Sequence, residues 1–521
     1  MPKTTVNIAN ESTINADVFS PKVLCVGMKN TLGTAVEGQR YEINGESDLI
    51  TLFGRDSHIS NGIREGLEYN APRYFLGSEQ VKYHAIAFNE NSAGTKDSKT
   101  ITLSGTITTA GTLTISVFSA TRFAVSIPIA VGDDLIDVNT AIKAAFDALP
   151  NFPFNSTISG TSSEIITFES KVKGGVFKDF NITYSLTSTG LAIAISAATN
   201  GATLPLAATI KSKIEEALES FDQRFWYISI ENAFINADPT LIDLINSYAN
   251  NSNYSKKSLL TVVKYDTRSN IASYLAGFNI LQYNVVAQSN LTASNSKGSN
   301  LISPFHASIL INSIYARKNT IGANVSDIGL DIGGIQNIPL SISGLPILGL
   351  KIKSEWVKAD YEALQDSNCG ILFQNENSQW AIIKETDPDH RVTLNLLSNG
   401  SEPVYKYFGD IDNQAFFQDY ATRLIKASFH KKTISAGTPP QNNSNALDIT
   451  MAIDKLLIVF QTIATFGVIS YSEAIKGQLR TRLQSTVAFN YVNKQISGTV
   501  EIEFITEILR VYLNVIPTAN N

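Results

Sequence analysis

Histidines and one short acidic run are the residues of this chain whose side chains could do chemistry. The five histidines are His58, His84, His306, His390 and His430. No two of them have the spacing of metal ligands in a single motif. His84 lies in an apolar run and is interpreted as a core residue. The run Glu385–Arg391 (ETDPDHR) places three carboxylates and a histidine within six residues.

The acidic run is the best metal candidate, because carboxylate oxygens are the preferred ligands of hard cations such as Ca²⁺. It lacks the glycine and the final glutamate that complete a calcium loop. Its Asp-Pro pair also favours a plain turn. We therefore predict no metal, no cofactor and no catalytic residue, and we expect that the chain is not an enzyme.

Two glycine-containing stretches match phosphate-binding loops only in part. In the stretch from Asp48 to Asn70 (DLITLFGRDSHISNGIREGLEYN), an apolar run ends at Gly54 and a helical pattern follows Ser57. Helix N-termini bind anions, but neither G-x-x-x-x-G-K-[ST] nor G-x-G-x-x-G is present. Ser57 is predicted to cap a helix that begins at the next residue, after a strand. The cluster GLDIGG (329–334) is predicted to be a loop.

The composition restricts which classes of protein the chain can belong to. The chain has 521 residues, enough for two to four domains, with 17% charged residues and a net charge of -6. No run of Lys or Arg is longer than a pair, so no nucleic-acid partner is predicted. Cys25 and Cys369 indicate neither a disulfide framework nor a zinc site. The longest apolar stretch, Leu456–Ile469, is too short and too interrupted to span a membrane. We expect a soluble protein made in a reducing cytoplasm.

Much of the chain alternates between short apolar runs and helical patterns. Runs typical of buried strands occur at 22–28, 83–88, 226–231, 258–266 and 283–290. Helical spacing of apolar residues is clear at 210–221 and 303–317. Such alternation predicts a parallel sheet with helices on its faces. We expect an α/β core in two parts, residues 21–96 and 201–410.

Residues 97–200 have a different texture and are predicted to form an inserted α+β domain rich in strands. Thr, Ile and Val alternate with period two from 101 to 129, and Ala110-Gly111 is predicted to be a hairpin turn. A helix and two strands are expected beyond it, at 137–149, 164–170 and 180–186. The polar segments 91–100 and 197–203 are interpreted as linkers, as an inserted domain requires.

The end of the chain, residues 411–521, is predicted to be helical with a terminal β-hairpin. The last strand, Gly498–Pro517, has one expected partner in this region, and two strands alone are marginal. The first twenty residues are polar. They are interpreted either as a frayed terminus or as an N-terminal arm, residues 1–20, that becomes a strand only on a partner.

Four segments, taken in order, carry a resemblance to a known family. They are LFGRDSHISNGIREGLEYN, the strand block from 101 with its helix and the strands around Lys173-Gly174, WVKADYEALQDSNCGILFQNENSQWAIIKET, and DIDNQAFFQDYATRLIKASFHKKTI with the domain that follows. Together they resemble the contractile tail sheath proteins of myophages, especially the Mu-like ones. Phe177-Lys178-Asp179 departs from relatives that often have Gly-Asn there, and residues 270–350 match only in texture.

The resemblance implies a structural subunit that polymerises with itself. In that family, homo-hexameric rings stack as a helical polymer around an inner tail tube, and contraction drives the tube through the target envelope. Baseplate and tail terminator proteins are the other implied partners, with no nucleic acid and no membrane insertion. The implied location is a virion tail, assembled in the host bacterial cytoplasm. The alternative is the sheath of a phage-derived contractile injection machine of tailocin or secretion type.

The resemblance also implies where subunits meet. Terminal arms would add strands to the C-terminal sheets of neighbouring subunits. The interface positions expected in the arms are Thr5, Val6, Ile8, Val500, Ile502, Phe504, Val511 and Leu513. In the family the C-terminal domain contacts the tube, so Lys476, Arg480 and Arg482 of the helix at 472–483 are predicted to face it. The inserted domain is expected on the outer surface, where its deletion would leave polymers intact.

Two other function classes fit the sequence less well. A surface-layer protein or adhesin would carry a secretion signal, and none is recognised here. A hydrolase with an α/β core would show a nucleophile in a defined turn, and no G-x-S-x-G motif occurs.

Overall fold

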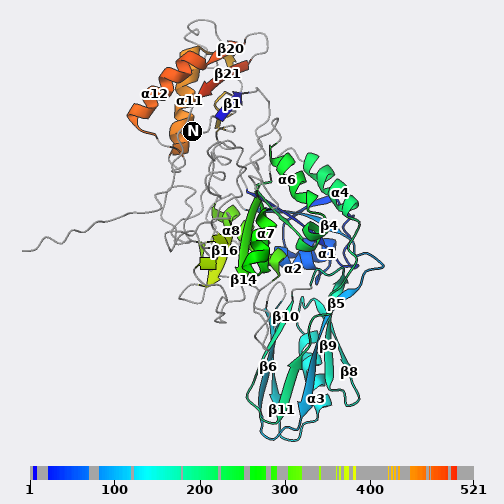
Figure 1. Cartoon of the computed structure of the whole chain (residues 1–521). Coiled ribbons are helices and arrows are strands. Elements are labelled where there is room, and N and C mark those ends of the chain that lie inside the picture. The colour runs from blue at the N-terminus through cyan, green and yellow to red at the C-terminus, as the bar shows by residue number, and fades with distance from the viewer. Residues whose placement is uncertain are drawn as a thin grey trace, which may run out of the picture.

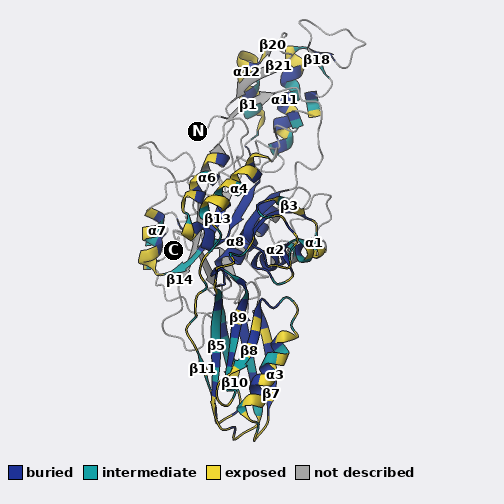
Figure 2. Cartoon of the chain, turned by 90° about the vertical axis from the view of Figure 1, so that its right-hand side faces the viewer, coloured by how far each residue is buried: buried dark blue, intermediate teal, exposed yellow. Residues whose placement is uncertain are grey.

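The structure of the chain is a computed structural model (Figure 1). It describes residues 4–8, 21–69, 81–118, 122–177, 180–220, 225–250, 259–276, 283–289 and 303–318, short segments between 340 and 434, and residues 446–464, 469, 471–490 and 495–500. In two views at right angles the molecule is elongated (Figures 1 and 2). The α/β core lies in the middle, the inserted strands form one end, and the last helices of the chain form the other.

Among the described residues, a nine-stranded sheet forms the centre of the core. Six strands are parallel and lie in the order β4-β2-β12-β13-β14-β16. Their bounds in that order are Lys82–Phe88, Lys22–Met28, Tyr227–Ile230, Leu259–Asp266, Tyr283–Ser289 and Gly370–Gln374. Antiparallel strands extend the two edges: β3 (Arg40–Ile43) next to β4, and β17 (Trp380–Ile382) and β15 (Leu340–Ser341) beyond β16. The parallel strands expected from the apolar runs are present.

Alternate side chains of β2 point to opposite faces of this sheet. Val23 and Cys25 enter one apolar cluster, while Leu24 and Val26 enter a second. The helices of the first face are α1 (Glu46–Phe53), α2 (His58–Tyr69) and α8 (Pro304–Lys318). Those of the second are α4 (Ala207–Glu219), α5 (Asn232–Ala237), α6 (Thr240–Asn250) and α7 (Arg268–Ala276). A parallel sheet requires cover on both faces, and Figure 2 shows its strands as the most buried part of the chain.

The apolar run that ends at Phe53 is a helix and not the expected strand. Leu49 and Phe53 are four residues apart and both buried, which is the spacing of one helix face. Gly54 follows the helix with a φ of 83°, a conformation that glycine adopts readily. The prediction was wrong because a short apolar run fits a buried strand and a buried helix face equally well.

The inserted domain is built from two sheets and one helix, α3 (Leu135–Asp147). One sheet has the order β11-β5-β9-β8, with bounds Leu191–Ile195, Lys96–Gly105, Ile165–Lys173 and Phe154–Ser159. The other has the order β10-β6-β7, with bounds Asn181–Leu186, Gly111–Phe118 and Arg122–Ile129. The hairpin predicted at Ala110-Gly111 is therefore wrong, because β5 and β6 belong to different sheets. The alternation was correct, but the partners of β5 come from later in the chain.

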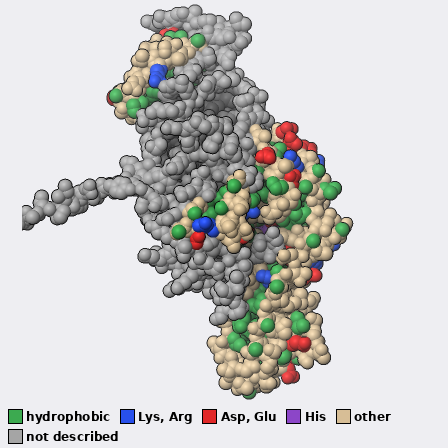
Figure 3. All heavy atoms as spheres, viewed as in Figure 1, with side chains coloured by type: hydrophobic (Ala, Val, Ile, Leu, Met, Phe, Trp, Pro, Cys, Tyr) green, Lys and Arg blue, Asp and Glu red, His purple; other side chains and the backbone are tan. Residues whose placement is uncertain are grey.

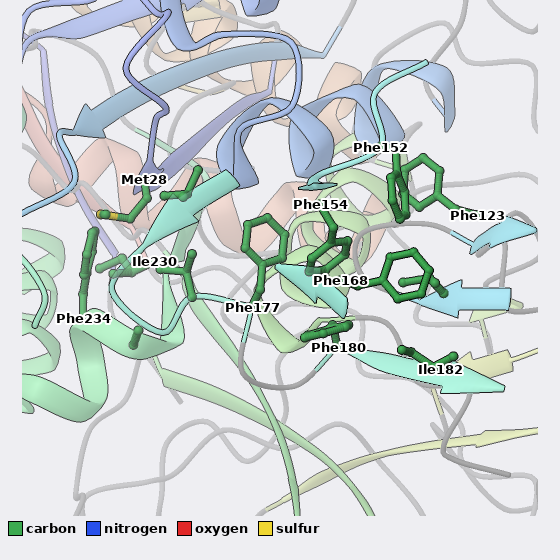
Figure 4. Packing of buried hydrophobic residues seen from close by; sticks show 14 of the residues in the cluster. Met28, Phe123, Phe152, Phe154, Phe168, Phe177, Phe180, Ile182, Ile230 and Phe234 are labelled. Carbon is green, nitrogen blue, oxygen red and sulfur yellow. The ribbon is translucent and has the colours of Figure 1, made fainter. Parts of the chain in front are cut away.

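The inserted domain packs directly against the core. Phe154 and Phe177 lie in the same apolar cluster as Met28, and Figure 4 shows Phe177 between the phenylalanines of the domain and the core residues. The segments 91–100 and 197–203, expected to be linkers, are joined to each other by backbone hydrogen bonds. Deleting the domain would uncover apolar side chains of the core, so the structure disfavours the expectation that it can be removed harmlessly.

The end of the chain forms a helical unit with a small sheet. Its helices are α11 (Ile449–Ala464) and α12 (Glu473–Thr486), preceded by the parallel pair β18 (Thr433–Ile434) and β19 (Ala446–Leu447). The hairpin strands are β20 (Ala488–Asn490) and β21 (Gln495–Val500). Buried Leu479 and Leu483 of α12 share an apolar cluster with Leu456 and Phe460 of α11. The two helices therefore form one packed unit, and α12 lies against β21 of the hairpin.

Candidate functional site in the terminal sheet

The histidines that the structure describes are all buried. His58, His84 and His306 are buried, with 0%, 2% and 0% of their surface exposed. His390, His430, the acidic run and the glycine cluster lie outside the described residues. Within the described ranges, no group of histidine, cysteine, aspartate and glutamate side chains has the geometry to hold a metal ion.

His84 is a core residue of β4 that an arginine contacts. Nη1 of Arg40 lies 3.2 Å from Nδ1 of His84, and because a guanidinium can only donate, this nitrogen accepts. Burial lowers the pKa of His84 to about 3, and nearby Arg40, Lys22 and Lys82 act in the same direction. The imidazole is therefore neutral, and His84 is part of the packed core.

His58 forms a buried pair with a carboxylate. Its Nδ1 lies 2.5 Å from Oε2 of Glu231, and Nε2 of His306 donates to the His58 carbonyl at 2.8 Å. Burial lowers the pKa of His58 to about 3, so the ring is neutral. Its Nδ1–H group donates a hydrogen bond to the Glu231 carboxylate. The aromatic rings of Phe177 and Phe305 enclose the imidazole, with centroids at 4.4 and 5.4 Å. The enclosed pair has no surface on which to meet a substrate.

The loop before α2 is a capped turn. The Ser60 amide donates to Oγ of Ser57 at 3.2 Å, which is the N-cap bond predicted from the sequence. A side chain at Gly54 would overlap the amide group of Asn30, so protein atoms already fill the space beside this glycine. Gly54 and Ser57 therefore shape the scaffold, as the sequence indicated.

The inserted domain covers the edge of the core sheet where open α/β sheets bind ligands. That place is the carboxyl end of the strands at the point where their order reverses, here between β2 and β12. Phe177 packs there, and a Cβ at Gly174 would lie 3.6 Å from Cε of Met28. The Lys173 amide donates to Oε2 of Glu90 at 3.0 Å just beyond β4. The usual ligand crevice of this topology is thus occupied by the chain itself.

The terminal sheet has an unusual third strand. β1 (Thr4–Ile8) pairs antiparallel with β21, from Thr4 opposite Val500 to Ile8 opposite Ile496. β20 pairs with the other side of β21, giving the order β1-β21-β20. Among the described residues, the third strand of this sheet therefore comes from the opposite end of the chain.

The segment between β1 and the core is long enough to allow more than one arrangement. Thirteen residues lie between Ile8 and Lys22, and the fourteen residue steps from one to the other span at most about 50 Å. Strand pairing uses main-chain hydrogen bonds, which do not depend on which molecule supplies the strand. The same tether could place β1 on its own hairpin or on that of an adjacent copy.

The predicted interface positions fall into two groups. Thr5, Val6 and Ile8 lie in β1, and Val500 is paired with Thr4 at the end of β21. Ile502, Phe504, Val511 and Leu513 lie outside the described residues. The structure thus brings together four of the eight positions in one sheet, within a single chain. Their role between chains stays a prediction.

The three cations predicted to face a tube do not share one face of α12. Lys476 and Arg480 are one turn apart, whereas Arg482 is rotated by about 200° from Arg480. Nζ of Lys476 lies 3.3 Å from Oε1 of Glu473, and Arg480 forms an ion pair with Asp454 of α11. Lys476 and Arg480 therefore have acidic partners in the same chain. Arg482 is exposed.

An exposed apolar stripe on α11 was missed in the sequence. Met451 and Ile458 are 45% and 60% exposed, and their spacing of seven residues places them on one side of the helix. The signal was present in the sequence, but the helix is so apolar that its buried and exposed faces are hard to tell apart.

On the face of the molecule drawn in Figure 3, the described lysines and arginines form no continuous basic stripe. On the face drawn in Figure 3, lysines and arginines occur singly, and the end formed by the inserted domain carries few charges. None of the described helices is long and apolar enough to cross a membrane.

Comparisons with known proteins include a distant likeness to a solved structure. No protein-family model matches the chain, and no curated protein matches it. Among solved structures, it is similar to the crystal structure of a sheath tail protein from Listeria innocua. That match covers 95% of this chain and 96% of the other, with 10% sequence identity and a TM-score of 0.42. The likeness concerns the course of the chain alone.

Proposed function

We propose that the chain is a structural subunit of a contractile tail sheath, which polymerises as stacked hexameric rings around an inner tube. Contraction of the polymer would drive the tube through the target envelope. The collinear resemblance of four sequence segments to tail sheath proteins supports the proposal. The described part of the chain adds a core whose usual ligand crevice is filled by its own inserted domain.

The observation that carries the proposal is the terminal sheet. An N-terminal strand completes a C-terminal hairpin, with five paired positions from Thr4 to Ile8. Each main-chain hydrogen bond contributes roughly 0.5–1.5 kcal/mol net. A few such bonds per subunit, repeated around every ring, would hold a polymer together while the tethers let the subunit bodies move.

In this proposal β1 leaves its own β21 on assembly and pairs with β21 of an adjacent copy. The exchange replaces one set of backbone bonds by the same set, so it has little net cost in bonding. The partners proposed are other copies of the chain, the inner tail tube, and the baseplate and terminator proteins. The subunit would do its mechanical work without catalysis, because the energy is stored at assembly.

A truncation that lacks residues 1–20 tests the proposal. We expect a folded protein, with the helix signal and melting behaviour of the full chain, that forms no sleeves. Electron microscopy and sedimentation of the truncated and full-length proteins under the same conditions give the answer. The matched control is the substitution Asn7→Ala, which keeps the backbone of β1 and should preserve assembly.

Two results would contradict the proposal. Long regular sleeves formed by the truncated chain would show that the N-terminal strand is not the fastening. A full-length protein that stays monomeric with tube protein and baseplate present would argue against a sheath altogether.

A further inference from the structure

Three segments of the chain meet where the inserted domain joins the core, and we call them the neck: 92–98, 170–177 and 197–204. Backbone bonds join them in pairs. The Thr95 amide donates to the Ala202 carbonyl at 3.0 Å, and the Gly174 amide donates to the Thr95 carbonyl at 2.9 Å. The three segments thus form a bonded collar rather than two free tethers.

A buried carboxylate lies at the centre of the neck. Asp97 is 0% exposed. Its Oδ1 accepts from the Gly201 amide at 2.7 Å, and its Oδ2 accepts from the Phe177 amide at 3.0 Å. Hydrogen bonds to an ionised acceptor are stronger than neutral ones. One side chain therefore ties the incoming segment to both of the others.

Phe177 continues this connection into the core. Its amide is bound by Asp97, and its ring meets the His58 ring at a centroid distance of 4.4 Å. His58 begins α2 and its Nδ1 lies 2.5 Å from Glu231, which directly follows β12. A continuous buried path thus runs from the inserted domain to a helix and a strand of the core.

The backbone segments of the neck are packed so closely that a side chain at Gly175 or Gly201 would overlap neighbouring backbone atoms. A Cβ on Gly175 would lie 2.6 Å from the Gly201 carbonyl oxygen, and one on Gly201 would lie 2.6 Å from that of Thr95. On the flank, Nζ of Lys171 lies 2.6 Å from Oδ2 of Asp56 in the turn before α2. Close backbone contact and a flanking ion pair both oppose bending at this point.

We propose that Asp97, Phe177, His58 and Glu231 form a buried lock that makes the inserted domain and the α/β core one mechanical and folding unit. A load on the inserted domain is passed through the lock to α2 and the central sheet instead of being absorbed by a hinge. The inference does not depend on which assembly the chain enters.

The substitution Asp97→Asn tests the lock in the full-length, unassembled chain. An asparagine can accept from one of the two amides, but its NH₂ group then faces the other N–H donor. We expect the peptides 92–98 and 197–204 to exchange amide hydrogen about tenfold faster or more. Calorimetry should show the inserted domain melting as a separate, earlier transition. The matched control is Asp133→Asn, because Asp133 accepts from the Ala130 amide at 2.7 Å in an exposed turn.

Two further measurements keep the inference testable if Asp97→Asn does not fold. In the parent protein, amides of the neck should exchange together with those of β2 and β12, through opening of the whole unit. Phe177→Leu keeps an apolar side chain but removes the ring from His58, and should also separate the two melting transitions. Neck amides that exchange well before β2 in the parent, or a folded Asp97→Asn protein with unchanged exchange and one transition, would overturn the lock.

Discussion

At the scale of single residues, His84 gives the chain a defined response to acid. Burial lowers its pKa from 6.5 to about 3, so between these values the unfolded state binds a proton that the folded state does not. The stabilisation is complete above pH 6.5 and is lost as the pH falls through this window. We predict that His84→Gln removes about 2 kcal/mol of the difference in unfolding free energy between pH 7 and pH 5.

Urea unfolding of the unassembled chain at several pH values measures this difference. Between pH 7.5 and 8.5 neither state takes up a proton at His84, so parent and variant should respond to pH equally there. An equal response between pH 5 and 7 as well would mean that the imidazole is charged in the fold.

Comparing Gly54 with Gly132 separates the two costs of replacing a glycine: the strain of a positive φ, and the overlap of the added Cβ with neighbouring atoms. Gly54 and Gly132 both have positive φ, 83° and 88°. A Cβ at Gly132 would meet nothing within 4 Å, whereas one at Gly54 would overlap Asn30, which also accepts from the Leu32 amide at 2.9 Å. We predict a loss of about 1–2 kcal/mol for Gly132→Ala, from backbone conformation alone, and a larger loss for Gly54→Ala. Thermal unfolding compares the two, and equal losses would show that Asn30 moves aside freely.

At the scale of elements, the parts that could be predicted are those with a local signal. Strands β2, β4 and β13 are continuous apolar runs, and α8 has helical spacing, so each is visible in its own sequence window. The run at Asp48–Phe53 is too short for that test and was assigned to the wrong element. The turn at Ala110-Gly111 was assigned to a hairpin because sequence windows do not show which strand a strand pairs with.

The elements that could not be predicted depend on contacts between distant residues. Asp97 lies in a polar segment that reads as a linker, yet it is buried because Phe177 and Gly201 supply its partners. β1 has weak alternation, and its pairing with β21 spans nearly the whole chain. In the candidate site, composition suggested the missing partner of the hairpin but not the register of the pairing.

The helix pair α11 and α12 carries a prediction about tube binding. Lys476 has Glu473 beside it, so reversing its charge disturbs a local exposed pair worth at most about 1 kcal/mol. Arg482 is on another side of α12 and is exposed. We predict that Arg482→Glu weakens co-sedimentation with the tube protein more than Lys476→Glu does, and most strongly at low salt, where exposed charges are least screened. Sheath polymerisation without tube should be unchanged, and tube binding by both variants equal to that of the parent chain would exclude α12 as the contact.

At the scale of the whole molecule, β1 near the N-terminus and β21, which ends at Val500, meet in one sheet, while the inserted domain lies at the far end (Figure 1). In the proposed polymer, subunits would be joined through the terminal sheet at one end, and the locked core and inserted domain would turn about it as a rigid arm. The proposal thus assigns fastening to the terminal sheet and movement to the locked core and inserted domain.

A cross-strand disulfide would show directly which chain supplies the strand. Val6 lies opposite Gly498 in the register of β1 and β21, and opposite residues of antiparallel strands are close enough for a disulfide. Both native cysteines, Cys25 and Cys369, are fully buried and should not compete. We predict that the double variant Val6→Cys, Gly498→Cys forms an internal bond in the unassembled subunit and bonds between chains in assembled sleeves. Non-reducing gels separate the two products, with each single variant as a control. Sleeves that yield only internally bonded monomers would mean that β1 stays on its own hairpin and that another contact holds the polymer together.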